Sequence, residues 1–164
     1  MKHTAYLFAI SFILIVTGCA AGISRQSRSK VTYTGTFSAL QKTPDAYKGE
    51  VVMLGGKIIE IKASSSLSEL TVLQLALDVN GQPVNPDQSE GRFIVQVKKL
   101  LDPAIFQKDR YLTAVGTLKG SKLKSIGGFQ YNYLLVEAIE IKLWPKGMGT
   151  SPTIHLGIGV GASF

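Results

Sequence analysis

The residue whose type and spacing point most directly to chemistry is Cys19, the single cysteine of the 164-residue chain. It follows Val16, Thr17 and Gly18, which together with it form the pattern of the bacterial lipobox: a branched aliphatic residue, two small residues and an obligatory cysteine. Small residues allow an extended chain to enter a peptidase cleft, and the thiol is then alkylated by a diacylglycerol. The motif predicts that Cys19 begins the mature protein and carries a diacylglycerol and an N-acyl chain.

Residues 1–18 have the composition of a cleaved signal peptide. Lys2 and His3 precede an apolar stretch from Ala5 to Val16 that only Ser11 interrupts. This stretch is about twelve residues long, whereas a helix needs roughly twenty to span a bilayer. We therefore expect cleavage after residue 18, with an uncleaved signal anchor as the alternative, and we place the mature protein in the cell envelope with membrane lipid as its partner through Cys19.

Catalytic chemistry has few candidates elsewhere in the sequence. The histidines, His3 and His155, are far apart, and no GxSxG, HExxH or Walker-type motif is present. Glu137 and Glu140 are a nearby carboxylate pair, but an odd spacing within a strand is expected to place them on opposite faces. The sequence therefore predicts no enzyme, no metal site and no cofactor other than the acyl groups on Cys19.

Binding chemistry is concentrated in one stretch that combines basic and aromatic side chains. The candidate residues of this ligand surface are Lys119, Lys122, Lys124, Phe129, Tyr131 and Tyr133. Aromatic rings beside lysines can bind nucleic acid, but a lipid-anchored envelope protein rarely meets it. An anionic lipid, lipopolysaccharide phosphates or a periplasmic glycan fits the same residues. The alternative is that the tyrosines pack at a barrel end and the lysines are solvated.

The elements that must position these residues are predominantly strands. Alternating apolar residues and turn-rich interruptions predict five strands, at Val51–Lys62, Leu70–Val79, Arg92–Lys98, Tyr111–Lys119 and Tyr133–Trp144. Asp102-Pro103 predicts a short helix through Lys108 between the third and fourth strands, and Gly120–Asn132 is expected to be a loop. This order is that of a small all-β, OB-like barrel, with Gly55-Gly56 as the bend that lets the first strand pair at both edges. An open meander or a small sandwich is the alternative.

The regions on either side of the barrel have distinct compositions. Residues 19–34 are expected to form the lipid anchor and a flexible tether, in which Arg25, Arg28 and Lys30 either contact anionic headgroups or act as a solubilising spacer. The barrel domain is expected over residues 35–145. Residues 146–164 form a glycine-alternating tail that could complete the sheet or add as a strand to an envelope partner protein.

Several segments of the barrel region together resemble the Slp family, the starvation-inducible outer-membrane lipoproteins of Gram-negative bacteria. These segments are Gly55–Ile59, Leu101–Pro103 with Phe106, Val115–Gly120, Tyr131–Tyr133 and Leu135–Glu137 through Trp144. The resemblance implies a lipoprotein of the outer membrane, with the periplasmic side favoured over the cell surface, and a non-catalytic structural or binding role in starvation or stress. Ala20 supports this location, because Asp at that position is the usual signal for retention in enterobacterial lipoproteins. The tail after Trp144 departs from the family pattern.

Overall fold

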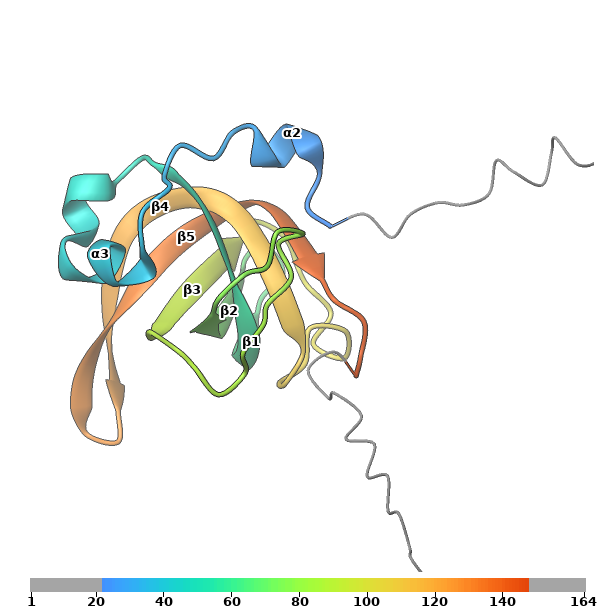
Figure 1. The fold of residues 1–164 in the computed structure, drawn as a ribbon. Coiled ribbons are helices and arrows are strands. Elements are labelled where there is room, and N and C mark those ends of the chain that lie inside the picture. Colours follow the sequence, from blue (N-terminus) through green and yellow to red (C-terminus); the bar gives the residue numbers. More distant parts are fainter. Residues whose placement is uncertain (1–21, 148–164) are drawn as a thin grey trace, which may run out of the picture.

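The computed structural model describes residues 22–147, within which five strands close into a barrel (Figure 1). The strands are β1 (Val51–Ala63), β2 (Ser68–Leu75), β3 (Arg92–Val97), β4 (Tyr111–Ile126) and β5 (Phe129–Leu143). They follow the order β1-β2-β3-β5-β4 around the barrel, with β3 and β5 parallel and the other neighbours antiparallel. This arrangement confirms the predicted OB-like barrel.

The barrel closes through the central part of β1. Residues 55–57 pair with β2 on one side, where Gly56 is opposite Gln74, and with β4 on the other side, where Gly56 is opposite Leu112. A Cβ atom at Gly56 would lie 1.9 Å from the backbone oxygen of Leu73. Only glycine permits this approach of two backbones, which confirms the predicted bend at Gly55-Gly56.

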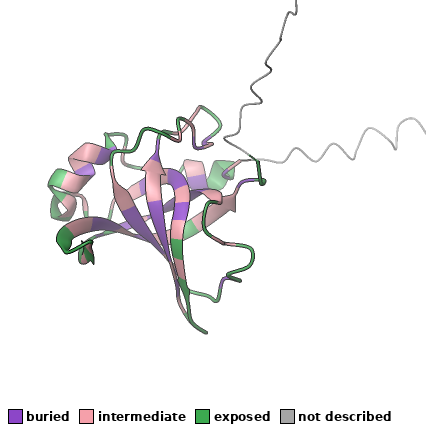
Figure 2. Ribbon diagram, turned by 90° about the horizontal axis from the view of Figure 1, so that it is seen from below, coloured by how far each residue is buried: buried purple, intermediate pink, exposed green. Residues whose placement is uncertain are grey.

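The core fills the barrel and is closed at one end by a short helix. Figure 2 shows the buried residues along the strands and the exposed residues mainly in loops and on the outer sides of helices. The helix α3 (Phe37–Lys42) begins at Thr36, whose hydroxyl accepts a hydrogen bond from the Ala39 amide. It inserts Phe37 and Leu40 into the core, where Phe37 packs edge-on against Phe93 of β3 with ring centroids 6.2 Å apart. The 3-10 helix η1 (Pro44–Tyr47) follows and leads into β1.

The predicted helix between the third and fourth strands is wrong, because this segment forms only a single turn. The amides of Ile105 and Phe106 both donate to the backbone oxygen of Asp102 at 3.0 Å, and the Asp102 side chain caps the turn as expected. Asp109 then adopts a positive φ of 67°, which cannot continue a right-handed helix and directs the chain into β4. The residues are therefore described as a capped turn between β3 and β4.

The predicted loop at Gly120–Asn132 is also wrong, because β4 and β5 continue through it as a hairpin. Ile126 pairs with Phe129 across a two-residue turn. Gly127 and Gly128 have φ values of 55° and 88°, which is the conformation of a type I′ turn and favours glycine at both positions. We call the hairpin formed by residues 119–133 the β4–β5 arm.

The predicted flexible tether is wrong for residues 22–34, which lie against the barrel. We call this segment the N-terminal strap. It contains the helix α2 (Arg25–Arg28), and its Ile23 side chain is only 5% exposed. Residue 19, the predicted signal segment and the glycine-alternating tail from residue 148 onward lie outside the described residues. No helix within residues 22–147 has the length and apolar character needed to cross a membrane.

Candidate functional site

The β4–β5 arm brings four of the six predicted ligand-surface residues onto one face. Lys122 lies opposite Tyr133, and Lys124 lies opposite Tyr131, so that the pairs occupy alternate positions along the two strands. We call this face the lysine–tyrosine ladder. Phe129 stands at the tip of the same arm and is 81% exposed.

The two tyrosines of the ladder are packed rather than open. Their rings meet edge to face with centroids 5.1 Å apart, and the Lys124 Nζ lies 5.7 Å from the centroid of Tyr133. Tyr133 is only 4% exposed, and the Tyr131 hydroxyl accepts a hydrogen bond from Gln41 Nε2 of α3 at 3.2 Å. A base or sugar would have to displace Lys124 to stack on Tyr133. The groups of the ladder that a ligand can reach are therefore the polar ones.

The charges of both ladder lysines act on one carboxylate, that of Glu69. Lys122 Nζ lies 3.6 Å from Glu69 Oε1, and the Gln96 side-chain amide donates to the same oxygen at 2.8 Å. The hydrogen bond from Gln96 holds the pKa of the Glu69 carboxyl below its ordinary value, because it outweighs the opposing effect of burial, and the positive charges of Lys122 and Lys124 add to it. Two lysines thus act on a single ionised carboxylate.

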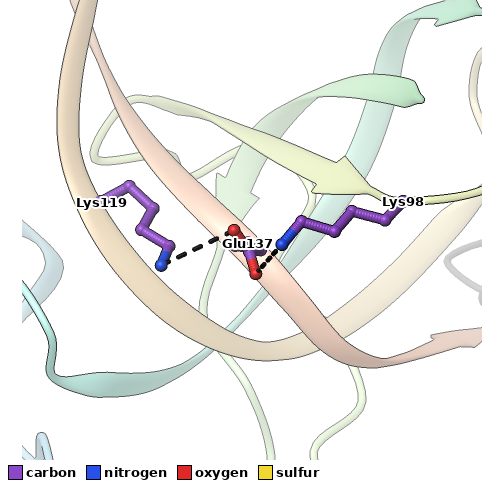
Figure 3. Close-up of polar contacts among 3 residues, drawn as sticks. All are labelled: Lys98, Lys119 and Glu137. Atoms are coloured by element: carbon purple, nitrogen blue, oxygen red, sulfur yellow. Dashed lines mark hydrogen bonds and ion pairs between the residues drawn. The ribbon is translucent and has the colours of Figure 1, made fainter. Parts of the chain in front are cut away.

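A second cluster repeats this arrangement around Glu137 of β5 (Figure 3). Lys98 Nζ lies 2.7 Å from Glu137 Oε1, and Lys119 Nζ lies 3.6 Å from Glu137 Oε2, so the two lysines approach the carboxylate from different sides. The hydrogen bond from Lys98 lowers the pKa of the Glu137 carboxyl against a smaller effect of desolvation, and the charge of Lys119 lowers it further. This cluster also contains one more positive than negative charge.

Sheet register joins the two clusters into one surface. Gln96 is opposite Glu69 on β2 and opposite Glu137 on β5, so the three side chains form a row on the same side of neighbouring strands. We call the four lysines around this row, Lys98, Lys119, Lys122 and Lys124, the lysine surface. The structure therefore brings together all three sequence-predicted lysines and adds Lys98, which the sequence analysis named only as the last residue of a predicted strand.

The two outer glutamates of β5 do not form an acid–base pair. A register shift makes Ala138 the partner of Gly116 and Glu140 the partner of Val115, so that Ala138 and Ile141 both contact the core. Glu137 and Glu140 consequently share the outer face, which corrects the expectation that they point to opposite faces. They bind different groups, lysines and Ser24 respectively. Among residues 22–147, no three His, Cys, Asp or Glu side chains lie together as a metal site requires.

Comparison with known proteins decides the family. The model of the outer membrane lipoprotein Slp family matches residues 16–156, which is most of the chain. The chain belongs to the Slp family. This confirms the resemblance seen in the sequence. The matched region begins at the first residue of the predicted lipobox and includes Cys19, while acylation of Cys19 itself remains a prediction.

Three relatives show how far sequence similarity extends along the chain. The outer membrane protein Slp of Escherichia coli is 28% identical over 88% of this chain and 76% of its own length. The E. coli lipoprotein YeaY is 25% identical over 84% of this chain and 71% of its own length. A protein of Haemophilus influenzae is 27% identical over 88% of this chain and 78% of its own length.

Among solved structures, the small single-stranded DNA-binding protein of Streptomyces coelicolor superposes with a TM-score of 0.38 and 10% identity. The superposition covers 58% of this chain and 94% of the other.

Proposed function

We propose that the protein is an outer-membrane lipoprotein, anchored on the periplasmic side through acylated Cys19, whose barrel has a non-catalytic binding role in the envelope. The observation that carries this proposal is the Slp family match, which starts at Val16 and includes the lipobox cysteine. Each buried methylene of an acyl chain contributes about 0.8 kcal/mol to membrane binding, so a cysteine with two or three chains is held essentially permanently. The anchor would therefore need no transmembrane helix.

The test of the anchor is the intact mass of the protein extracted from separated inner and outer membranes. We expect a chain that begins at Cys19 with the added mass of a diacylglycerol and an acyl group, recovered from the outer-membrane fraction. The Cys19→Ser variant serves as the control and should lose both the added mass and the membrane association. An unmodified wild-type chain, or one recovered in a soluble fraction, would contradict the proposal.

The lysine surface supports an anionic envelope molecule as the ligand. In OB-type barrels the loop between strands 4 and 5 and the face of strands 2 and 3 bind oligomeric ligands such as oligosaccharides. Here the β4–β5 arm and the Glu69–Gln96–Glu137 row occupy these positions, and each carboxylate is shared by two lysines. We propose a phosphorylated glycan, of which lipopolysaccharide is the available probe. The phosphates would replace the carboxylates as partners of the surplus lysine charges.

Two further roles rest on the sequence alone. Docking of an assembly partner through residues 146–164 is one of them, and nearly all of that tail lies outside the described residues. A role in starvation or stress is implied by the family resemblance. An increase of the protein in stationary-phase cells over growing cells, measured by quantitative immunoblotting, is the result that this role predicts.

A further inference from the structure

We propose that the barrel sits on the membrane in one fixed orientation. In this orientation the barrel end formed by Gly22–Arg25, the turn at 78–81 and Trp144–Gly147 contacts the lipid headgroups, and the lysine–tyrosine ladder points away from them. We call this end the membrane-facing end. The inference rests on the proposed acylation of Cys19 and goes beyond it, because an acylated chain on a long tether would allow every orientation of the barrel.

The first support is the attachment of the N-terminal strap to β5. Ser24 donates from its amide to Glu140 Oε1 at 3.0 Å and from its hydroxyl to Glu140 Oε2 at 2.5 Å. The Ser24 hydroxyl also caps α2 by accepting from the Ser27 amide at 3.1 Å. Ile23, next to Ser24, is buried against the barrel. The strap is therefore held by polar and apolar contacts that begin immediately after Gly22.

The second support is the attachment of the same strap to the turn at 78–81. The Arg28 guanidinium donates to the backbone oxygens of Val79 and Asn80. A Cβ atom at Gly22 would lie 2.7 Å from the Asn80 oxygen and 3.6 Å from the Trp144 ring, which shows how closely the three residues meet. The strap, the turn and the end of β5 thus form one packed unit.

The third support is the short length of chain between the lipid and this unit. Only Ala20 and Ala21 separate Cys19 from Gly22. Three residue steps of at most 3.3–3.6 Å limit the Cα–Cα distance between Cys19 and Gly22 to about 10 Å. With acyl chains on Cys19 in the bilayer, the membrane-facing end must lie at the headgroup layer.

The chemistry of the membrane-facing end fits that layer. Val79 is 90% exposed at the tip of its turn, and the segments of this end carry three basic residues: Arg25 and Lys146 are exposed, and Lys142 is partly exposed beside the Trp144 ring. The carboxylates of Glu140 and Asp78 at this end are used internally, because Glu140 binds Ser24 and Asp78 Oδ1 accepts from the amides of Asn80 and Gln82. An apolar tip among basic residues matches a surface of anionic phospholipid headgroups.

The opposite end of the molecule carries the candidate binding surface. In Figure 1 the described chain begins and ends on one side of the barrel, and the tip of the β4–β5 arm and α3 lie on the other side. An anchor at the membrane-facing end therefore presents the lysine–tyrosine ladder to the space beyond the lipid. A barrel that rotated freely on a tether would present all of its faces equally to the lipid.

The test compares two single thiols introduced at exposed positions, Val79→Cys and Phe129→Cys. Acylation occupies Cys19, so the introduced thiol is the only one available to a fluorescent label. The acylated proteins are reconstituted in vesicles of phosphatidylethanolamine and phosphatidylglycerol that contain a headgroup nitroxide quencher. We expect quenching at position 79 to be at least five-fold stronger than at position 129. Equal quenching at the two positions would overturn the inference.

A second variant distinguishes orientation from simple attachment. Ser24→Ala, Arg28→Ala and Glu140→Ala, placed together in the Val79→Cys background, remove the side-chain bonds that hold the strap to β5 and to the turn at 78–81 and lengthen the effective tether. We expect quenching at position 79 to fall toward the value at position 129, and unchanged quenching would also overturn the inference. Intact mass distinguishes failure of this inference from failure of the proposed anchor. An unacylated chain would contradict both proposals. An acylated chain with equal quenching at the two positions would contradict the fixed orientation alone.

Discussion

Ser24 and Glu140, which are 116 residues apart, are joined by two hydrogen bonds to the two oxygens of one carboxylate. The first of these residues lies in the N-terminal strap and the second in the last strand of the barrel. The segment that follows the predicted lipid attachment site is thereby fixed to the folded domain. A composition that indicates a tether can thus belong to an ordered part of the structure.

Glu140→Gln should weaken the attachment of the strap without unfolding the barrel. The neutral amide cannot accept two charge-assisted bonds as the carboxylate does, and such bonds contribute about 1.5–3 kcal/mol. Hydrogen exchange of the amides of residues 23–28 should accelerate, while exchange in β1 and β4 stays at the wild-type rate. Glu60→Gln is the control, because Glu60 is paired only with Lys62 on the surface. Equal acceleration in both variants would contradict the prediction.

Attachment of the strap should depend on pH. Burial acts to raise the pKa of the Glu140 carboxyl, but hydrogen bonds from Ser24 and Ser27 together outweigh it and hold the pKa below its ordinary value near 4.5. A lowered pKa in the folded state stabilises the attachment fully above the ordinary value, and this stabilisation is lost as the pH falls through the folded-state pKa.

Limited proteolysis of the strap, measured from pH 7 to pH 3, should therefore increase below about pH 4.5. The Glu140→Gln variant should lack this increase in proteolysis at low pH. If the increase persists in the variant, a titrating group other than Glu140 causes it.

The double substitution Lys122→Ala, Lys124→Ala should reduce binding to lipopolysaccharide. It removes two positive charges from the lysine–tyrosine ladder, and a charge-assisted bond to phosphate is worth about 1.5–3 kcal/mol, so we expect at least a ten-fold loss of affinity. The matched control is Lys108→Ala, Lys146→Ala, which removes the same charge from exposed positions outside the lysine surface. Equal losses in the two double variants, measured by titration with the melting temperature unchanged, would assign binding to net charge alone.

Glu69→Gln should have the opposite effect on the same ligand. The glutamine keeps a partner for the Gln96 amide but removes the negative charge that attracts Lys122 and Lys124. Both lysines then have more charge available for phosphate, and we expect binding to lipopolysaccharide to tighten several-fold. The difference should shrink at high salt, because these partly exposed charges are screened. Weaker binding in the variant would show that the ladder is not the site.

Gly56→Ala should destabilise the barrel strongly. The added methyl group would meet the Leu73 backbone oxygen, which cannot move without separating β1 from β2, and we expect a loss of about 3 kcal/mol or failure to fold. The matched variant is Gly55→Ala. Its nearest neighbour would be the Leu77 Cδ2 atom, the end of a side chain that can rotate. A loss of about 1 kcal/mol is expected there, measured by thermal unfolding. Similar losses at both positions would contradict this account of barrel closure.

The barrel itself was predictable because its signals are local. Alternating apolar residues placed five strands, and Gly55-Gly56 marked the point of closure. The errors came from segments whose pattern is ambiguous by itself. Asp102-Pro103 begins a turn as well as it begins a helix, and the positive φ of Asp109 decides between them. The residues of the β4–β5 arm are polar enough for a loop, and the Gly127-Gly128 turn was the unused signal for a hairpin.

The candidate surface was predictable only in part. Lys122, Lys124, Tyr131 and Tyr133 lie close enough in sequence to be grouped by inspection. Their carboxylate partner Glu69 and the added Lys98 come from strands whose positions depend on the parallel pairing of β3 with β5. The contact between Ser24 and Glu140 is equally non-local. Propensity and periodicity describe neighbours along the chain and carry no information about such contacts.

The bond between Ser24 and Glu140 also imposes an order in time. A chain is synthesised from its N-terminus, so Ser24 emerges well before the carboxylate that will bind it. Until β5 follows, the strap can bind the turn at 78–81 through Arg28, but its two bonds to Glu140 cannot form. Closure of the barrel and full attachment of the strap therefore depend on the same strand. The last strand to be made is the one that fixes the first residues in place.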